Sequence, residues 1–255
     1  MADAVFLTAK WHHLAMLNYA VDPVILEPLV PAGTKLDLWH GQAYVSVVGF
    51  RFLDTRVLGL PIPFHRDFEE VNLRFYVRRR VDDQWRRGVV FVKELVPRAA
   101  IAWVARALFN ENYQAVPMSF RMEAFPGGPI PESGPADPRS VCYSWRFQGR
   151  ENRLRILVDD RLPVRACRRD PIEPGSQTEF ITEHYFGYSR QKDGGTLEYR
   201  VYHPRWRTWP VREARLECDV SSLYGEAFKS CLCEVPASAI LADGSEVTVY
   251  RGVRV

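Results

Sequence analysis

The stretch FEEVNLRFYVRRR, residues 68–80, alternates strictly between apolar and polar side chains. In an extended chain, one side carries only apolar residues, which are Val71, Leu73, Phe75 and Val77. The opposite side carries Glu70, Asn72, Arg74, Tyr76 and Arg78. This pattern predicts a strand with its apolar face on a core. The polar face then meets bulk water, as on most half-exposed strands, or it lines an enclosed polar cavity and forms a binding site.

Further segments along the chain have strand character. They are LDLWHGQAYVSVVGFRF (36–52), GVVFVKEL (88–95), FITEHYFGYSR (180–190), LEYRVYHPRW (197–206) and VTVYRGVRV (247–255). VDDQWRR is predicted to turn 68–80 back onto 88–95 as a hairpin, and 22–31 is predicted to be a short helical turn bounded by prolines. One longer helix is predicted over 97–109, where apolar residues recur at helical spacing after Pro97. Such a β-rich α+β chain predicts a closed or partly closed antiparallel β-barrel with flanking helices, because closure removes exposed strand edges.

The segment PGGPIPESGPADP, residues 126–138, holds eight Pro or Gly in thirteen positions. It is either an interdomain linker or a long excursion between paired strands. Strand-like sequence on both sides favours the excursion. We therefore expect a single domain over residues 1–255.

Composition excludes several classes of protein. The net charge of +3 is too small to indicate nucleic acid, and the arginines at 78–80 and 86–87 are interpreted as a solvated hairpin end. The sequence contains neither a secretion signal nor a run of apolar residues long enough to span a membrane. Five cysteines without framework spacing are typical of reduced thiols, so we expect a cytoplasmic protein that binds neither nucleic acid nor membrane. An oligomer of identical chains is left open.

Known catalytic motifs are missing from the sequence. It has no G-x-S-x-G element, no dinucleotide fingerprint and no P-loop, and its six histidines lack the spacings typical of metal ligands. We therefore expect no metal site and no cofactor. The remaining candidates are the polar face of 68–80 and the segment FNENYQAVPM (109–118), which contains Tyr113 and Gln114. The plainer interpretation is that these two residues only pack, and that Glu70 and Arg74 form a surface ion pair contributing under about 1 kcal/mol.

Taken in order, several segments resemble the YqjF-like family, whose function is unknown. They are WHHLAMLNYAVDPVILEPLVPAGTKLDLWHGQAYVSVVGF (11–50), FEEVNLRFYVRR, GVVFVKELVPRAAIAWVARALFNENYQAVPM, FITEHYFGYS and YRVYHPRW. The resemblance runs from about Leu7 to Val211. That family in turn is similar to the acetoacetate decarboxylase superfamily. The resemblance implies a cone-like antiparallel β-barrel with flanking helices and an internal small-molecule cavity, in which Glu70 matches an active-site acid.

The chemistry of the decarboxylases transfers less well. In those enzymes a paired-lysine motif follows the helix. One lysine forms a Schiff base with the substrate, and its cationic neighbour helps to depress its pKa. Here residues 110–114 read NENYQ and contain no lysine. Lys93 is the one candidate substitute, since alternation groups it with Val89 and Phe91.

We therefore assign expected roles without an imine. Glu70 is the candidate base, and Tyr113 the candidate hydrogen-bond donor or general acid. The candidate substrate-binding residues are Arg74 for a carboxylate, Asn72 as a neutral donor, Gln114, and His203 and Trp206 in the cavity wall or rim. For His203 and Trp206, a packed loop is the plainer interpretation. The expected ligand is a small carboxylate or carbonyl compound, and three functions stay open: an acid–base enzyme, a non-catalytic binding or sensing module, and an interaction protein.

Overall fold

The computed structural model describes residues 4–61, 65–99, 110–125, 137–159 and 170–255. The predicted helix over 97–109 and the Pro/Gly-rich excursion at 126–138 fall largely outside these residues. In the first half of the described chain, the elements are β1 (Val5–Val21), α1 (Pro23–Leu26), η1 (Glu27–Leu29), β2 (Lys35–Leu36), β3 (Ala43–Val57), β4 (Leu60–Pro61), β5 (Phe68–Val81), β6 (Gln84–Val96), β7 (Tyr113–Ala115) and β8 (Met118–Ala124).

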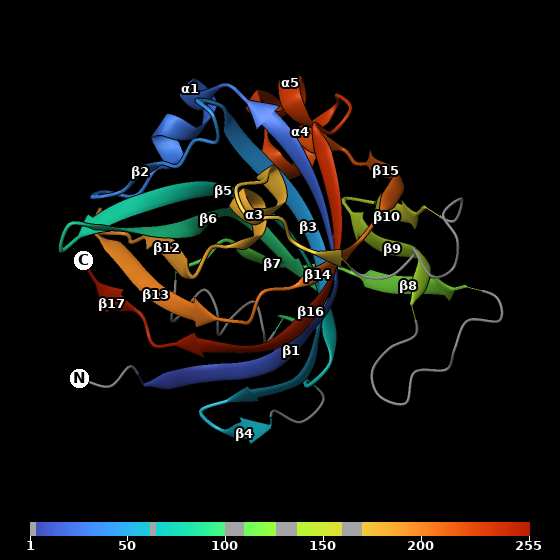
Figure 1. Ribbon diagram of the computed structural model, residues 1–255, viewed down its shortest axis with the longest axis horizontal. Coiled ribbons are helices and arrows are strands. Elements are labelled where there is room, and N and C mark those ends of the chain that lie inside the picture. Colours follow the sequence, from blue (N-terminus) through green and yellow to red (C-terminus); the bar gives the residue numbers. More distant parts are fainter. Residues whose placement is uncertain (1–3, 62–64, 100–109, 126–136, 160–169) are drawn as a thin grey trace.

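The second half contains β9 (Pro138–Phe147), β10 (Arg150–Val158), β11 (Asp170–Pro171), α3 (Gln177–Thr182), β12 (Phe186–Arg190), β13 (Thr196–Tyr202), β14 (Arg207–Trp209), β15 (Val211–Glu217), α4 (Val220–Tyr224), η2 (Glu226–Phe228), α5 (Lys229–Leu232), β16 (Ser238–Tyr250) and β17 (Val253–Arg254). Strands dominate the described residues, as the sequence predicts, and the helices among these residues are short (Figure 1).

The large sheet closes on itself. Strands β16, β1, β3, β5, β6, β12 and β13 pair in that order, and β13 pairs in turn with β16. We call this arrangement the strand ring. Its pairings are antiparallel except between β12 and β6, where Phe186 and Gly187 pair in parallel with Gly88 and Val89. The short β7 also pairs in parallel with β6. The sheet is therefore mainly antiparallel, as expected, with two short parallel pairings.

The predicted hairpin is formed by β5 and β6. Asp82 and Asp83 join the two strands, and both have positive φ, at 47° and 61°. A two-residue turn with positive φ at both positions matches the right-handed twist of the paired strands, and Asp tolerates this conformation better than most residues. The turn sets the register from Val81 opposite Gln84 to Arg74 opposite Phe91.

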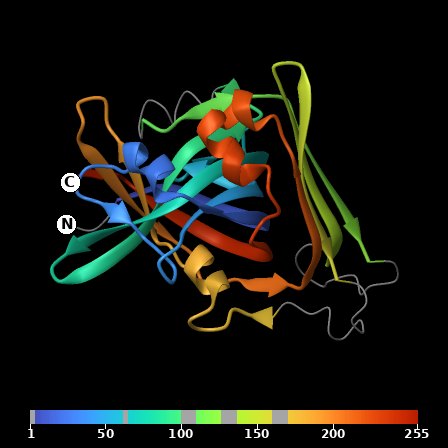
Figure 2. The same ribbon diagram turned by 90° about the horizontal axis from the view of Figure 1, so that it is seen from above.

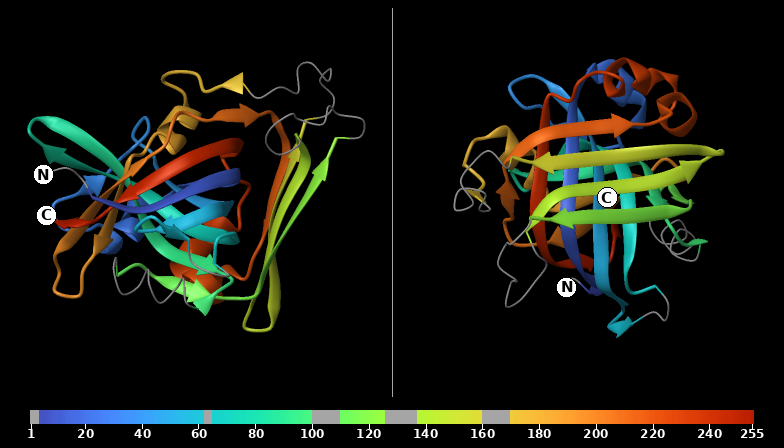
Figure 3. Two further views of the ribbon diagram at one scale, coloured as in Figure 1. Left: turned by 90° about the horizontal axis from the view of Figure 1, so that it is seen from below. Right: turned by 90° about the vertical axis from the view of Figure 1, so that its right-hand side faces the viewer.

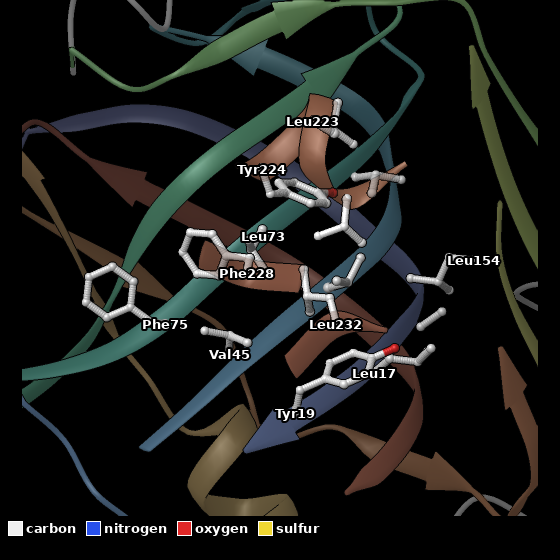
Figure 4. Close-up of a cluster of buried hydrophobic side chains, with 14 of the residues drawn as sticks. Leu17, Tyr19, Val45, Leu73, Phe75, Leu154, Leu223, Tyr224, Phe228 and Leu232 are labelled. Atoms are coloured by element: carbon white, nitrogen blue, oxygen red, sulfur yellow. The ribbon is translucent and has the colours of Figure 1, made fainter. Parts of the chain in front are cut away.

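A second sheet stands beside the strand ring. It has the order β15-β10-β9-β8, and Figures 2 and 3 show it flanking the ring, with the outer face of this sheet toward the viewer in the right-hand view of Figure 3. The main core lies between the ring, this sheet and the C-terminal helices. Figure 4 shows side chains of β1, β3 and β5 meeting Leu154 of β10 and residues of α4, η2 and α5.

The apolar face of β5 points into this core. Val71, Leu73, Phe75 and Val77 all have an exposed fraction of 0%. Full burial of such side chains stabilises the fold by about 1.5–3 kcal/mol each. Alternation then forces the polar face of β5 toward the interior of the strand ring.

Two of the arginines at the hairpin end, Arg79 and Arg86, do not match the interpretation as a solvated cluster. Arg79 and Arg86 both contact the carboxylate of Glu198, which is buried and also accepts a hydrogen bond from Tyr188 Oη at 3.0 Å. A buried carboxylate needs such partners, because its desolvation is otherwise costly. These arginines therefore fix β13 against the β5–β6 hairpin.

Candidate functional site

A pocket of about 210 Å³ lies inside the strand ring. Residues from β1, β3, β5, β6, β12, β13 and β16 all line it. Most of its wall is apolar and aromatic, formed by residues that include Trp11, Phe50, Phe52, Phe68, Phe91 and Trp206. Its polar residues include Glu70, Asn72, Arg74, Glu94, Glu111, Tyr113, His184, Tyr199 and His203. Apolar walls with a few convergent polar groups are typical of small-molecule sites.

The polar face of β5 supplies three neighbouring groups to this pocket. Glu70, Asn72 and Arg74 line it, whereas the intervening residues Val71 and Leu73 point into the core. Of the two orientations left open by the sequence, the structure therefore shows the inward one for these three residues. The interpretation of Glu70 and Arg74 as a surface ion pair does not fit, because Glu70 is 2% exposed.

Glu70 is buried between two hydrogen-bond donors. Its Oε1 accepts a hydrogen bond from Asn72 Nδ2 at 2.9 Å, and its Oε2 accepts one from Tyr113 Oη at 3.1 Å. Burial raises the pKa of Glu70 to about 7, while the bonds from Asn72 and Tyr113 and the charge of Arg74 partly oppose this rise. Glu70 is therefore a carboxyl group that exchanges its proton near neutral pH.

A β-bulge in β6 decides which side chain faces the pocket. Leu73 pairs with Lys93 but Arg74 pairs with Phe91, so Val92 is an extra residue in the ladder. The Val92 carbonyl accepts a hydrogen bond from Asn112 Nδ2 at 2.9 Å instead. Because the bulge reverses the alternation, Val89 and Phe91 line the pocket and so does Glu94.

Lys93 consequently lies on the other face of β6. Its Nζ is 5.4 Å from the ring centroid of Phe147, which belongs to the main core. Partial burial lowers the pKa of Lys93, but its amine is directed away from Glu70. None of the lysines, all of which lie in the described part of the chain, lines the pocket.

Glu94 is held between Asn72 and Tyr113. It pairs with Asn72 of β5 on one side and with Tyr113 of β7 on the other. Its side chain is 1% exposed, and Oε2 is buried without a hydrogen-bond partner among the described residues. Burial, followed by the charges of Glu111 and Glu70, raises the pKa of Glu94 well above its ordinary value. Both causes favour the protonated form of Glu94.

Glu111 completes a group of three buried carboxyls. Its Oε1 accepts a hydrogen bond from Tyr199 Oη at 3.0 Å, and burial raises its pKa to about 8. Gly187 makes room for the Tyr199 ring, because a Cβ atom at this position would lie 2.1 Å from Tyr199 Cζ. The glycine of β12 thus allows the tyrosine of β13 to reach Glu111.

Tyr113 reaches the pocket from the short strand β7. Burial raises its pKa well above the ordinary value, so the phenol keeps its proton and remains a donor. Gln114, the next residue, points to the other side of β7 and is not among the residues that line the pocket. The structure thus brings Tyr113 and not Gln114 to the pocket, because neighbouring residues of a strand point to opposite sides.

Arg74 presents an incompletely paired guanidinium to the pocket. One Nη donates a hydrogen bond to the Ile181 carbonyl at 3.3 Å. Its Nε is buried and has no partner among the described residues. A buried N–H without an acceptor is costly, so this group favours a ligand with an acceptor such as a carboxylate.

His203 and Trp206 form part of the aromatic wall. Their rings stack with centroids 4.2 Å apart, and Trp11 lies 6.3 Å from each. Trp206 Nε1 donates to Ser245 Oγ at 2.9 Å, and His203 Nδ1 lies 3.0 Å from the Pro204 carbonyl. Burial lowers the pKa of His203, so its imidazole is neutral at pH 7. The structure places both residues at the pocket, as packed and hydrogen-bonded walls.

Simple alternation in the sequence does not reveal every polar group of the pocket. The alternation pattern does not predict Glu94 as a pocket residue, because it does not predict the bulge in β6. Glu111 could have been predicted, because it lies two residues before Tyr113. Residues at this spacing lie on the same side of an extended segment. Tyr199 precedes Val201 and His203 at the same spacing, and all three line the pocket.

The described residues hold neither a metal-binding cluster nor a membrane-spanning helix. No group of three or more His, Cys, Asp or Glu side chains in the described part of the chain is arranged to hold a metal ion. Within the same residues, no helix has the length and apolar character needed to cross a membrane.

Sequence comparison connects the chain with proteins of unknown activity. The DUF2071 family model, described as an uncharacterized conserved protein, matches residues 8–246. Uncharacterized protein YqjF of Bacillus subtilis (strain 168) is 41% identical over 77 residues, which are 29% of this chain and 32% of that protein. The match thus spans about a third of the length of this curated relative.

Structural comparison identifies the fold. An acetoacetate decarboxylase from Legionella pneumophila superposes with a TM-score of 0.63 at 12% identity, over 99% of this chain and 88% of that chain. An acetoacetate decarboxylase-like enzyme from Sphingomonas wittichii RW1 gives 0.63 at 14% identity, over 100% and 94%. The enduracididine biosynthesis enzyme MppR, complexed with pyruvate, gives 0.61 at 11% identity, over 100% and 91%. The acetoacetate decarboxylase-like fold expected from the sequence is confirmed.

Proposed function

This chain belongs to the DUF2071 family, and we propose that it is an acid–base enzyme acting on a small organic acid that contains a carbonyl group. The observation that carries the proposal is Glu70, a carboxyl with a pKa of about 7 in a largely apolar pocket. A group that titrates near working pH is suited to take a proton from a substrate and return it. Perturbed carboxyls also occur in structural networks, so the geometry of the neighbouring groups has to support the same function.

The neighbouring groups support a keto acid. Arg74 Nε needs an acceptor and can hold a carboxylate, and Tyr113 can donate to an oxygen beside Glu70. A pocket of about 210 Å³ suits a compound smaller than a typical drug-sized ligand. One structural neighbour is an acetoacetate decarboxylase and another is complexed with pyruvate, so keto acids are a reasonable first panel.

The proposed chemistry is removal of a proton from the carbon next to the carbonyl. Ionised Glu70 takes the proton, the C–H electron pair forms a carbon–carbon double bond, and the carbonyl π pair moves to oxygen. If the Glu70 carboxyl trades this proton with solvent before it reprotonates the same carbon, the result is hydrogen exchange, and protonation of another carbon gives isomerisation. Neither outcome requires a lysine imine, an oxidant or a reductant.

The test is exchange of carbon-bound hydrogen in D₂O, followed by ¹H NMR. We expect the protein to accelerate loss of the C3 signals of pyruvate or 2-oxobutyrate above the rate in buffer. If neither compound nor the neutral ketone butanone exchanges faster, the enzyme proposal is rejected.

The second candidate function is non-catalytic binding of a small ligand. It is favoured by the aromatic wall, since stacked His203 and Trp206 can hold an apolar body without any proton transfer. Binding of 2-oxobutyrate without exchange would support this function over the enzyme.

Arg74→Ala is expected to remove the thermal stabilisation that 2-oxobutyrate gives to the protein. A hydrogen bond to a charged group contributes about 1.5–3 kcal/mol, so we expect affinity to fall by about one to two orders of magnitude. Butanone, which has no carboxylate, should stabilise both proteins equally. Arg80→Ala is the matched control, because Arg80 pairs with Asp83 at the exposed hairpin turn. Unchanged stabilisation in Arg74→Ala would remove Arg74 from the site.

A further inference from the structure

Glu94 is a buried carboxyl of the pocket whose buried Oε2 has no hydrogen-bond partner among the described residues. Glu70 uses both oxygens, with Asn72 and Tyr113, and Glu111 has a bond from Tyr199. Oε2 of Glu94 is buried and lacks a partner, although Glu94 lines the pocket. A polar atom of this kind costs free energy in the ligand-free protein, and a bound molecule can recover it.

The position of Glu94 relates it directly to the proposed base. It lies opposite Asn72 in the β5–β6 ladder, and Asn72 donates to Glu70. On its other side it pairs with Tyr113, which also donates to Glu70. Asn72 and Tyr113 are thus neighbours of both carboxyls, and Glu70 and Glu94 line the same pocket.

We infer that Glu94 acts as a neutral acid whose O–H donates a hydrogen bond to the carbonyl oxygen of the substrate. This inference rests on the proposed function and adds a second catalytic residue to it. While Glu70 takes the carbon-bound proton, negative charge develops on the carbonyl oxygen, and the Glu94 O–H stabilises that charge. Donors placed where charge develops are often the largest single contribution to catalysis.

The surroundings of Glu70 and Glu94 suit them to different roles, Glu70 as the base and Glu94 as the hydrogen-bond donor. Glu70 accepts two hydrogen bonds and lies near Arg74, all of which favour its ionised form and lower its pKa. Around Glu94, burial is the largest cause that raises the pKa, and the charges of Glu111 and Glu70 raise it further. Each ionisation of Glu70 therefore strengthens the protonated state of Glu94. Neighbouring carboxyls with pKa values pushed apart are the usual basis of an acid–base pair.

The test compares Glu94→Gln with Glu94→Leu in the exchange assay with 2-oxobutyrate. Gln keeps a neutral donor of nearly the same shape, so we expect a rate within about 10-fold of the wild type. Leu has no donor, so we expect a loss of about 10²–10³-fold. Glu69→Gln is the control, because Glu69 is next to Glu70 but is not among the residues that line the pocket. Full pH profiles separate a loss of rate from a shift in the titration of Glu70.

An infrared measurement supplies a readout that does not depend on turnover. The carbonyl band of a neutral carboxylic acid should be present at pH 7, should lose intensity in both Glu94 variants, and should shift when 2-oxobutyrate is added. Wild-type exchange that persists in Glu94→Leu rejects this inference alone. Equal loss in Gln and Leu shows that Glu94 acts as an anion and also overturns it. No exchange in the wild type rejects the proposed function and the inference together.

Discussion

Glu70→Gln is expected to lower the rate of hydrogen exchange from 2-oxobutyrate by about 10³-fold. The amide has nearly the shape of the carboxyl group but cannot accept a proton from carbon, and general-base catalysis contributes about 10²–10⁴-fold. The rate of the wild type should rise with pH and level off above a pKa of about 7, because the ionised form of Glu70 is the active one. Rates measured by ¹H NMR between pH 5 and 9 provide both results.

Two comparisons make this prediction specific. Glu69→Gln changes the adjacent carboxyl, which is half-buried and is not among the pocket-lining residues, and should keep the wild-type rate. Binding of 2-oxobutyrate to Glu70→Gln should persist, since Arg74 still holds the carboxylate. If Glu70→Gln exchanges as fast as the wild type, Glu70 is not the base.

The second large effect concerns stability, which should depend on the ionisation of Glu111. Burial raises the pKa of this carboxyl to about 8 from an ordinary value of 4.5, so the native state keeps a proton that the unfolded chain loses. Its contribution to stability is therefore complete below about pH 4.5 and is lost as the pH rises toward 8. One unit of pKa corresponds to about 1.4 kcal/mol, so the loss is on the order of 4 kcal/mol.

The measurement is urea denaturation of the wild type and Glu111→Gln between pH 5 and 8.5. We expect the free energy of unfolding of the wild type, relative to the variant, to fall steeply as the pH rises. Taking the difference cancels titrating groups that do not interact with Glu111, such as the buried neutral His184, whose pKa is lowered to about 4. Glu246→Gln is the control, because Glu246 is 83% exposed. A difference that stays constant with pH would show that Glu111 is ionised in the fold.

Much of the fold follows from local patterns in the sequence. Alternation in 68–80 identifies β5 and its buried face, because a strand with apolar residues at every second position has only one way to bury them. The Asp82–Asp83 turn is equally local. The parallel pairings of β6 with β7 and β12 could not be predicted this way, since they join residues distant along the chain.

The site was predicted only in part, for a related reason. Glu70, Asn72 and Arg74 follow from the alternation of a regular strand, once its polar face is known to point inward. Lys93 and Glu94 exchange faces because a single residue, Val92, bulges from the ladder. The environment of a carboxyl also depends on the whole fold: Glu111 meets Tyr199 across 88 positions of sequence.

The account depends on Glu70 being a titrating group inside the protein, which ¹³C NMR of its side-chain carboxyl can measure directly. Asn72→Ala and Tyr113→Phe each remove a hydrogen-bond donor to Glu70, so the resonance that changes in both variants is assigned to its carboxyl carbon. The chemical shift of this resonance is then followed from pH 3 to 9. We predict a midpoint near 7 in the protein without added keto acid. A midpoint near the ordinary value of 4.5 would mean that water reaches this carboxyl, and it would contradict the buried site on which the proposed chemistry rests.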